Sequence, residues 1–173
     1  MAALLVAGSA PALAAAPAAT AVVSAAGVRA AGDNLIENGD FEGYFRGWNT
    51  GSTPGAQQIL DGGPTGKYLQ VTPGGYVEQS VDVKPDTAYE LMLNTATPQL
   101  SATVRLSGAG SSGSGSQEYR YDNREWKEHT VRFTTSPEST RVTLRLYSSS
   151  VGYFDDVRLA ESLCGALKQP GRS

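Results

Sequence analysis

Short segments in which apolar and polar residues alternate run through most of the chain from Asn34 onward. Alternation with a period of two is typical of β-strands that bury one face. Clusters of Gly, Pro, Asp and Ser, which favour turns, separate the segments. This spacing predicts an all-β sandwich or barrel. The expected strands are Tyr68 to Thr72, Tyr76 to Val83, Ala88 to Asn94, Ala102 to Ser107, Glu118 to Tyr121, His129 to Thr134, Arg141 to Tyr147 and Val151 to Leu159.

The alternation also separates a core face from an outward face in several of these strands. The residues expected to point inward are apolar: Val104, Leu106, Val131, Phe133, Val142, Leu144 and Leu146. Their neighbours are polar or aromatic and are expected to point outward: Thr103, Arg105, Arg132, Thr143, Arg145 and Tyr147. Rings that stack and guanidinium groups that donate several hydrogen bonds are the groups a sugar-binding sheet needs. Any solvated sheet face, however, has a similar composition.

Length and charge narrow the classes of partner. A chain of 173 residues fits one domain. The formal net charge of -3 and the pI of about 5.1 provide no positive field that would attract nucleic acid or an anionic membrane. Cys164 is the only cysteine, so no intramolecular disulfide can form and stability must come from packing, hydrogen bonds or a metal.

The N-terminal tract has a different composition from the rest. Residues 1–31 are rich in Ala, Val and Leu and almost free of charge, which predicts a signal peptide with an Ala-rich spacer and a secreted, extracellular protein. A membrane anchor is the alternative, but Gly8, Pro11 and Pro17 interrupt the apolar run that an anchor requires. We expect the β-sandwich to occupy residues 33–160 and a tail to occupy residues 161–173.

Three motifs occur in a consistent order along the domain. The first is N-L-I-E-N-G-D-F-E at residues 34–42, followed by Gly47-Trp48. The second is V-D-V-K-P-D-T-A-Y at residues 81–89, and the third is Y-F-D-D-V-R-L at residues 153–159. Together they resemble CenC-type modules, the carbohydrate-binding families 4 and 9, although Asp86 stands where those families usually have Gly. The resemblance implies a two-sheet antiparallel β-sandwich of jelly-roll type that binds plant or cell-wall polysaccharides, with Trp48 and Trp126 in packing positions.

The same resemblance implies a structural calcium ion. In those families the equivalents of Glu42 and Asp155 commonly bind the ion together with backbone oxygens, here from residues 64–67 including Lys67. Alternation places Asp155 on the face of Val157 and Leu159, so its carboxylate is expected to point toward the core. A buried charge needs a partner, and calcium prefers several oxygen ligands. A salt bridge or a solvated cap is the alternative; Asp61 could supply a further acidic ligand.

Six residues are the candidate glycan ligands. We name them by their place in the chain and by their chemistry: Tyr76, Arg105, Tyr119, Tyr121, Arg145 and Tyr147. A tyrosine ring can stack on the C–H face of a sugar while its hydroxyl makes a hydrogen bond. Each tyrosine could equally be a cross-strand packing residue.

These observations lead to one main functional hypothesis and two alternatives. We expect a calcium-stabilised monomer that binds polysaccharide or oligosaccharide without catalysis, and that binds neither nucleic acid nor membrane. No nucleophile motif accompanies His129, the only histidine. A small glycan-active hydrolase or lyase, or a fragment of a larger glycoside hydrolase, is the first alternative, since paired carboxylates cannot be judged from spacing. A surface adhesion or structural module on the same fold is the second.

Overall fold

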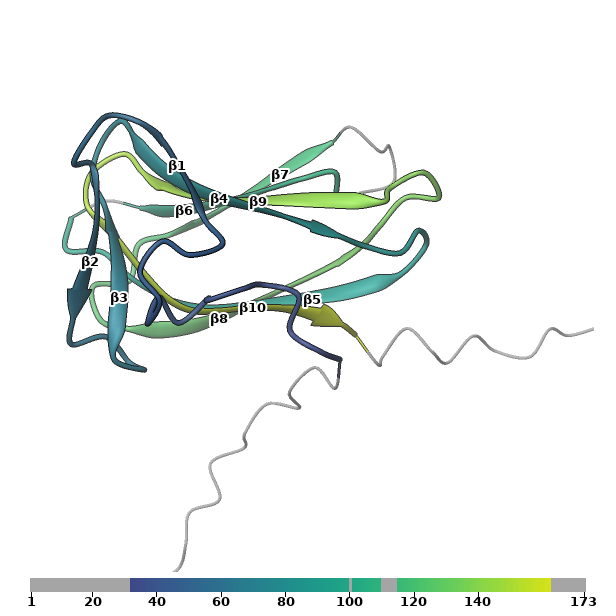
Figure 1. The fold of residues 1–173 in the computed structure, drawn as a ribbon, viewed down its shortest axis with the longest axis horizontal. Coiled ribbons are helices and arrows are strands. Elements are labelled where there is room, and N and C mark those ends of the chain that lie inside the picture. The colour runs from purple at the N-terminus through teal and green to yellow at the C-terminus, as the bar shows by residue number, and fades with distance from the viewer. Residues whose placement is uncertain (1–31, 100, 110–114, 163–173) are drawn as a thin grey trace, which may run out of the picture.

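The computed structural model describes residues 32–99, 101–109 and 115–162 (Figure 1). The predicted signal peptide and spacer at residues 1–31 lie outside the described residues, as does the expected tail from residue 163 onward, including Cys164. The first two residues of that expected tail belong to the sandwich, because the last strand ends at Glu161 and the amide of Ser162 donates to the carbonyl of Ala88 at 2.8 Å. The described residues form no helix of the length and apolarity that a membrane crossing requires.

The described residues form ten strands in two antiparallel sheets, which face each other as two layers (Figure 1). Sheet A has the order β1 (Asn49–Ser52), β4 (Gly75–Asp82), β9 (Arg141–Ser148), β6 (Ala102–Ser107) and β7 (Ser116–Tyr121). Sheet B has the order β2 (Gln57–Asp61), β3 (Lys67–Val71), β10 (Gly152–Glu161), β5 (Ala88–Ala96) and β8 (Lys127–Thr134). This arrangement confirms the predicted two-sheet β-sandwich.

All eight strands expected from alternation are present, and two edge strands are additional. The sequence of β1 is Asn-Thr-Gly-Ser, which contains no apolar residue, and that of β2 is Gln-Gln-Ile-Leu-Asp, which does not alternate. Each lies at the edge of its sheet, where one side of the strand has no neighbour to pack against. A strand that buries little carries little periodic signal.

The core lies between the sheets and is built from the inward-facing apolar residues. All seven of the expected inward residues are buried, with exposed fractions from 0% for Val104 to 7% for Phe133. Thr103 shares the outward face with Arg105, as predicted, but only 3% of it is exposed. Arg120 and Tyr147 stand opposite it on the two neighbouring strands, so their large side chains flank a small one.

The two tryptophans occupy different environments. Trp48 is 6% exposed, its ring centroid lies 5.4 Å from that of the fully buried Phe41, and its Nε1 donates to the carbonyl of Asn38. The core position predicted for Trp48 is therefore confirmed. The same prediction was wrong for Trp126, which is partly exposed and contacts Tyr68 and Tyr153. Trp126 precedes β8, on which Val131 and Phe133 point inward, so alternation places Trp126 outward.

Candidate functional site

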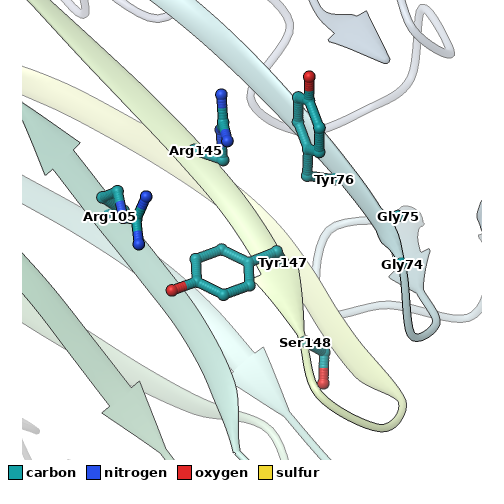
Figure 2. Close-up of a pocket in the computed structure, with 7 residues that line it drawn as sticks. All are labelled: Gly74, Gly75, Tyr76, Arg105, Arg145, Tyr147 and Ser148. Carbon is teal, nitrogen blue, oxygen red and sulfur yellow. The ribbon is translucent and has the colours of Figure 1, made fainter. Parts of the chain in front are cut away.

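Four side chains on the outer face of sheet A lie together over its central strands. Tyr76 on β4 stands opposite Tyr147 on β9, and Arg105 on β6 stands opposite Arg145 on β9. With Gly74, Gly75 and Ser148 they line an open pocket of about 290 Å³. Figure 2 shows the two rings and the two guanidinium groups projecting from this one face. We call this the sheet A pocket; it brings together four of the six residues named from sequence.

The ring of Tyr76 is held in place by its neighbours on both adjoining strands. On β9, the guanidinium carbon of Arg145 lies 4.0 Å from the ring centroid, which is within cation–π range. On β1, Gly51 stands opposite Tyr76, and a Cβ at position 51 would lie 1.9 Å from the ring carbon Cζ. Only glycine at that position leaves room for the ring as it lies. The edge strand that the sequence did not predict therefore shapes the pocket.

Two carboxylates orient the arginines of the pocket. Glu78 accepts hydrogen bonds from Nε and Nη2 of Arg145 at 2.9 and 2.7 Å. Glu118 accepts from Nε of Arg105 at 2.8 Å and from the Tyr147 hydroxyl at 2.6 Å. Charge-assisted bonds of this kind restrict how a guanidinium can turn. Both guanidinium groups are therefore held in place at the pocket that they line. Glu78 and Glu118 were missed from sequence, because only the cross-strand register shows which arginine each one meets.

These contacts hold the pKa of Glu118 well below the usual range for glutamate. The hydrogen bond from Tyr147, followed by that from Arg105, lowers the pKa of Glu118 to about 2. A carboxylate that accepts such bonds is favoured in its charged form. Because the pKa is lowered in the folded state, any contribution of Glu118 to stability is present above its ordinary pKa and is lost only as the pH falls toward about 2.

We expect an NMR titration of the Glu118 carboxyl carbon to show a midpoint near pH 2. Tyr147→Phe removes only the hydroxyl, and since that hydroxyl makes the largest contribution, the midpoint should rise toward the ordinary range for glutamate. Ser80→Ala, which alters a hydroxyl pair elsewhere on the same face, should leave the midpoint unchanged. A midpoint near 4.5 in the parent would show that the bonds to Glu118 are not formed in solution.

Tyr119 and Tyr121 do not share this face, which corrects the expectation that they alternate outward. Tyr119 stands opposite the buried Val104, and Tyr121 stands opposite the buried Ala102, so both rings face the space between the sheets. The ring of Tyr121 stacks on that of His129 with centroids 3.8 Å apart. Burial raises the pKa of Tyr121 to about 12. The outward residues of β7 are instead Glu118 and Arg120.

Asp155 is completely buried, as expected, but not on the core side. A register shift between Asp155 and Arg158 marks a β-bulge, and Asp156 within it has a φ of 49°. The bulge inserts a residue and so reverses the alternation. Asp155 therefore faces outward from sheet B, where it accepts hydrogen bonds from the amide of Thr65 at 3.0 Å and from its hydroxyl at 2.9 Å. Burial raises the pKa of Asp155.

Glu42 contacts the same loop as Asp155. Its Oε1 accepts a hydrogen bond from the amide of Lys67 at 2.7 Å, two residues after Thr65. The Lys67 ammonium forms an ion pair with Asp61 at 2.6 Å, so Asp61 is turned toward a cation that the chain supplies itself. Within the described ranges no three His, Cys, Asp or Glu side chains gather closely enough to hold a metal by themselves. Any ion held here would need backbone oxygens in addition to these carboxylates.

Comparison with known proteins gives one curated relative and a set of similar structures. No protein-family model matches the chain. The chain is 30% identical over 159 residues to exochitinase 1 of Streptomyces olivaceoviridis, and the alignment covers 87% of this chain. The same alignment covers only 25% of the length of that relative.

Three solved carbohydrate-binding modules are similar in fold. A family 61 module in complex with β-1,4-galactotriose has a TM-score of 0.60 at 17% identity, covering 75% of this chain and 99% of that module. A family 16 module has a TM-score of 0.59 at 23% identity, covering 74% of this chain and 100% of that module. A family 4 module has a TM-score of 0.54 at 17% identity, covering 73% of this chain and 99% of that module. The chain therefore has the jelly-roll β-sandwich fold of carbohydrate-binding modules, while membership of families 4 and 9 in particular stays a prediction.

Proposed function

We propose that this protein binds a β-linked polysaccharide at the sheet A pocket and does not cleave it. The observation that carries the proposal is the set of two tyrosine rings and two arginines arranged in register on one open face. Tyrosine rings can stack on the apolar face of a pyranose, and guanidinium N–H groups can donate to its hydroxyls. The pocket is open to solvent, as binding of a long chain requires.

A β-1,4-linked chain is the proposed ligand, with chitin as the first candidate. The curated relative is named for an activity on chitin, and this chain aligns with a quarter of it. The family 61 module of similar fold holds β-1,4-galactotriose. We further propose that the protein acts outside the cell, which is where residues 1–31 would direct it and where such polysaccharides occur.

The charge state of the pocket supports binding without hydrolysis. Glycosidases with paired carboxyl groups need one of them protonated to act as general acid. Glu118 has a pKa of about 2 and bonds to Arg105 and Tyr147, so it is a poor proton donor at neutral pH. Glu78 is engaged by Arg145. Both carboxylates are therefore better suited to orienting arginines than to acid–base chemistry.

Calorimetric titration with N-acetylchitohexaose, xylohexaose and β-1,4-galactotriose tests the proposal. We expect at least one of these sugars to bind, and we expect no new reducing ends to appear when the protein is incubated with the corresponding polymer. Failure to bind any of the three, or turnover that scales with protein concentration, would contradict the proposed function.

We also propose that Glu42 and Asp155 hold a calcium ion together with the backbone carbonyl of Lys67. The observation that fits calcium is a fully buried carboxylate, Asp155, with no ion pair to a Lys, Arg or His of the described residues. All of these candidate metal ligands are oxygen atoms, which a hard cation such as calcium prefers. Bound there, the ion would connect the opening loop, residues 34–48 before β1, to the last strand, β10.

Calcium is expected to raise the melting temperature of protein previously treated with a chelator. An ion that binds only the folded state adds about 2.7 kcal/mol of stability at a concentration 100 times its dissociation constant. Asp155→Asn should abolish the response, whereas Asp61→Asn, which removes a carboxylate paired with Lys67, should retain it. Identical melting of the parent with calcium and with chelator would rule the site out.

A further inference from the structure

A second group of aromatic side chains lies on the outer face of sheet B. Sheet B forms the opposite layer of the sandwich from sheet A, which carries the sheet A pocket (Figure 1). Tyr68 comes from β3, Tyr153 from β10 and Trp126 from the residue before β8. The centroid of Tyr68 lies 5.4 Å from that of Trp126 and 5.4 Å from that of Tyr153, and Trp126 and Tyr153 are 6.2 Å apart. We call these three rings the aromatic platform.

The three rings face solvent and are not part of the core. Each is partly exposed, whereas the core rings Tyr89 and Phe154 are at most 1% exposed. On β3 and β10 the neighbours Leu69 and Phe154 are fully buried, so Tyr68 and Tyr153 must point outward. Ala96 stands opposite Tyr153 on β5 and contributes only a methyl group between the rings. Packing of the sandwich interior therefore does not account for this cluster.

Amide side chains adjoin the rings in the same cross-strand rows. Gln58 on β2 stands opposite Gln70 on β3, and Gln70 stands opposite Tyr153. In the next row, Asn94 on β5 stands between two carboxylates, Asp155 on β10 and Glu128 on β8. The row from Gln58 to Ala96 carries no charged residue. An amide both donates and accepts hydrogen bonds, so rings flanked by amides match a neutral sugar, whose C–H face stacks while its hydroxyls bind.

We infer that the aromatic platform is a second glycan-binding site, which takes the same neutral β-linked oligosaccharides as the sheet A pocket. This inference rests on the proposed function, because it assigns a second site to the same class of ligand. The two sites lie on different sheets, and these sheets form the two layers of the sandwich (Figure 1). One molecule can then hold two polysaccharide strands at once and cross-link them, which a module with a single site cannot do.

The test begins from a Tyr76→Ala/Arg145→Ala variant, in which the sheet A pocket is disabled. Trp48 is 6% exposed and Trp126 is partly exposed, so a change in tryptophan emission on adding sugar reports mainly on the platform. The sugar is N-acetylchitohexaose, or xylohexaose if that is the one the parent binds. In calorimetric titration we expect two binding sites in the parent and one in this variant. The emission change should persist in the variant.

Substitutions in the platform should then weaken the remaining site. Adding Tyr153→Ala should lower its affinity between about 2-fold and about 12-fold, the range that loss of one aromatic contact covers. If Tyr153→Ala proves unstable, Gln70→Ala takes its place. It leaves the three rings in position and should also weaken binding. Thr130→Ala, an exposed outward position on β8, is the control and should have no effect.

The possible outcomes separate this inference from the proposed function. One site in the parent, with no binding by the Tyr76→Ala/Arg145→Ala variant, would overturn the second site and leave the sheet A pocket standing. No binding of any sugar by the parent would overturn both. Dimerisation in sedimentation experiments that disappears with Tyr153→Ala would assign the platform to self-association and would also overturn the inference.

Discussion

Glycan affinity at the sheet A pocket is expected to fall by about 100-fold when Tyr76 and Arg145 are both replaced by alanine. The ring supplies an aromatic contact of about 0.5 to 1.5 kcal/mol beyond its buried area, and hydrogen bonds from a charged group contribute about 1.5 to 3 kcal/mol. At 1.4 kcal/mol for each factor of ten, these contributions together exceed one order of magnitude. Calorimetric titration with the tightest-binding oligosaccharide measures the loss, and thermal melts establish that the variant folds.

A matched control lies on the same two strands. Asp82 and Arg141 form an exposed ion pair at 3.0 Å, again between β4 and β9, but outside the residues that line the pocket. Exposed pairs of this kind contribute at most about 1 kcal/mol to stability. Asp82→Ala/Arg141→Ala should therefore bind as the parent does. Equal affinity of the parent and the Tyr76→Ala/Arg145→Ala variant, or an equal loss in both double variants, would contradict the assignment.

Gly39→Ala is expected to cause the largest loss of stability, about 3 kcal/mol, the upper end for overpacking a filled site. A Cβ at position 39 would lie 1.9 Å from the backbone carbonyl oxygen of Val157. The carbonyl of Gly39 also accepts a hydrogen bond from the Val157 amide at 2.9 Å, so neither backbone can withdraw without breaking it. The opening loop would separate from β10. Urea unfolding of the parent and the variant measures the difference in the free energy of unfolding.

The neighbouring substitution Asp40→Ala is the control for this loop. Asp40 is exposed and its carboxylate accepts one long hydrogen bond, from the Glu42 amide at 3.3 Å. Loss of this hydrogen bond should lower the free energy of unfolding by less than about 1 kcal/mol. If Gly39→Ala is no more destabilising than Asp40→Ala, the contact between the opening loop and β10 is not as close as the structure shows.

The strands with buried apolar residues at every second position could be predicted from sequence. In β9 the fully buried Val142, Leu144 and Leu146 set the phase, and the same phase places Arg145 and Tyr147 outward. In the same way, the outward direction of Tyr76 and Arg105 follows from their buried neighbours Val77 and Leu106. The structure brings these four residues together, and their role in binding stays a prediction.

The remaining parts of the site depend on features that alternation does not encode. The sequence of β7, Ser-Gln-Glu-Tyr-Arg-Tyr, has no aliphatic residue to set its phase, so the inward direction of Tyr119 and Tyr121 came only from pairing with β6. The bulge at Asp156 reversed the direction of Asp155 without an inserted Gly or Pro to signal it. Glu118 meets Arg105 and Tyr147 only through the register of three strands.

Residue-resolved NMR mapping of the bound oligosaccharide locates the binding face of the sandwich. Backbone and side-chain signals of the labelled protein would be followed during titration with the best of the three sugars. We expect the largest chemical-shift changes to include Tyr76, Arg105, Arg145 and Tyr147, on the outer face of β4, β6 and β9. Changes confined to the loops at the ends of the sandwich, with none on this face, would contradict it.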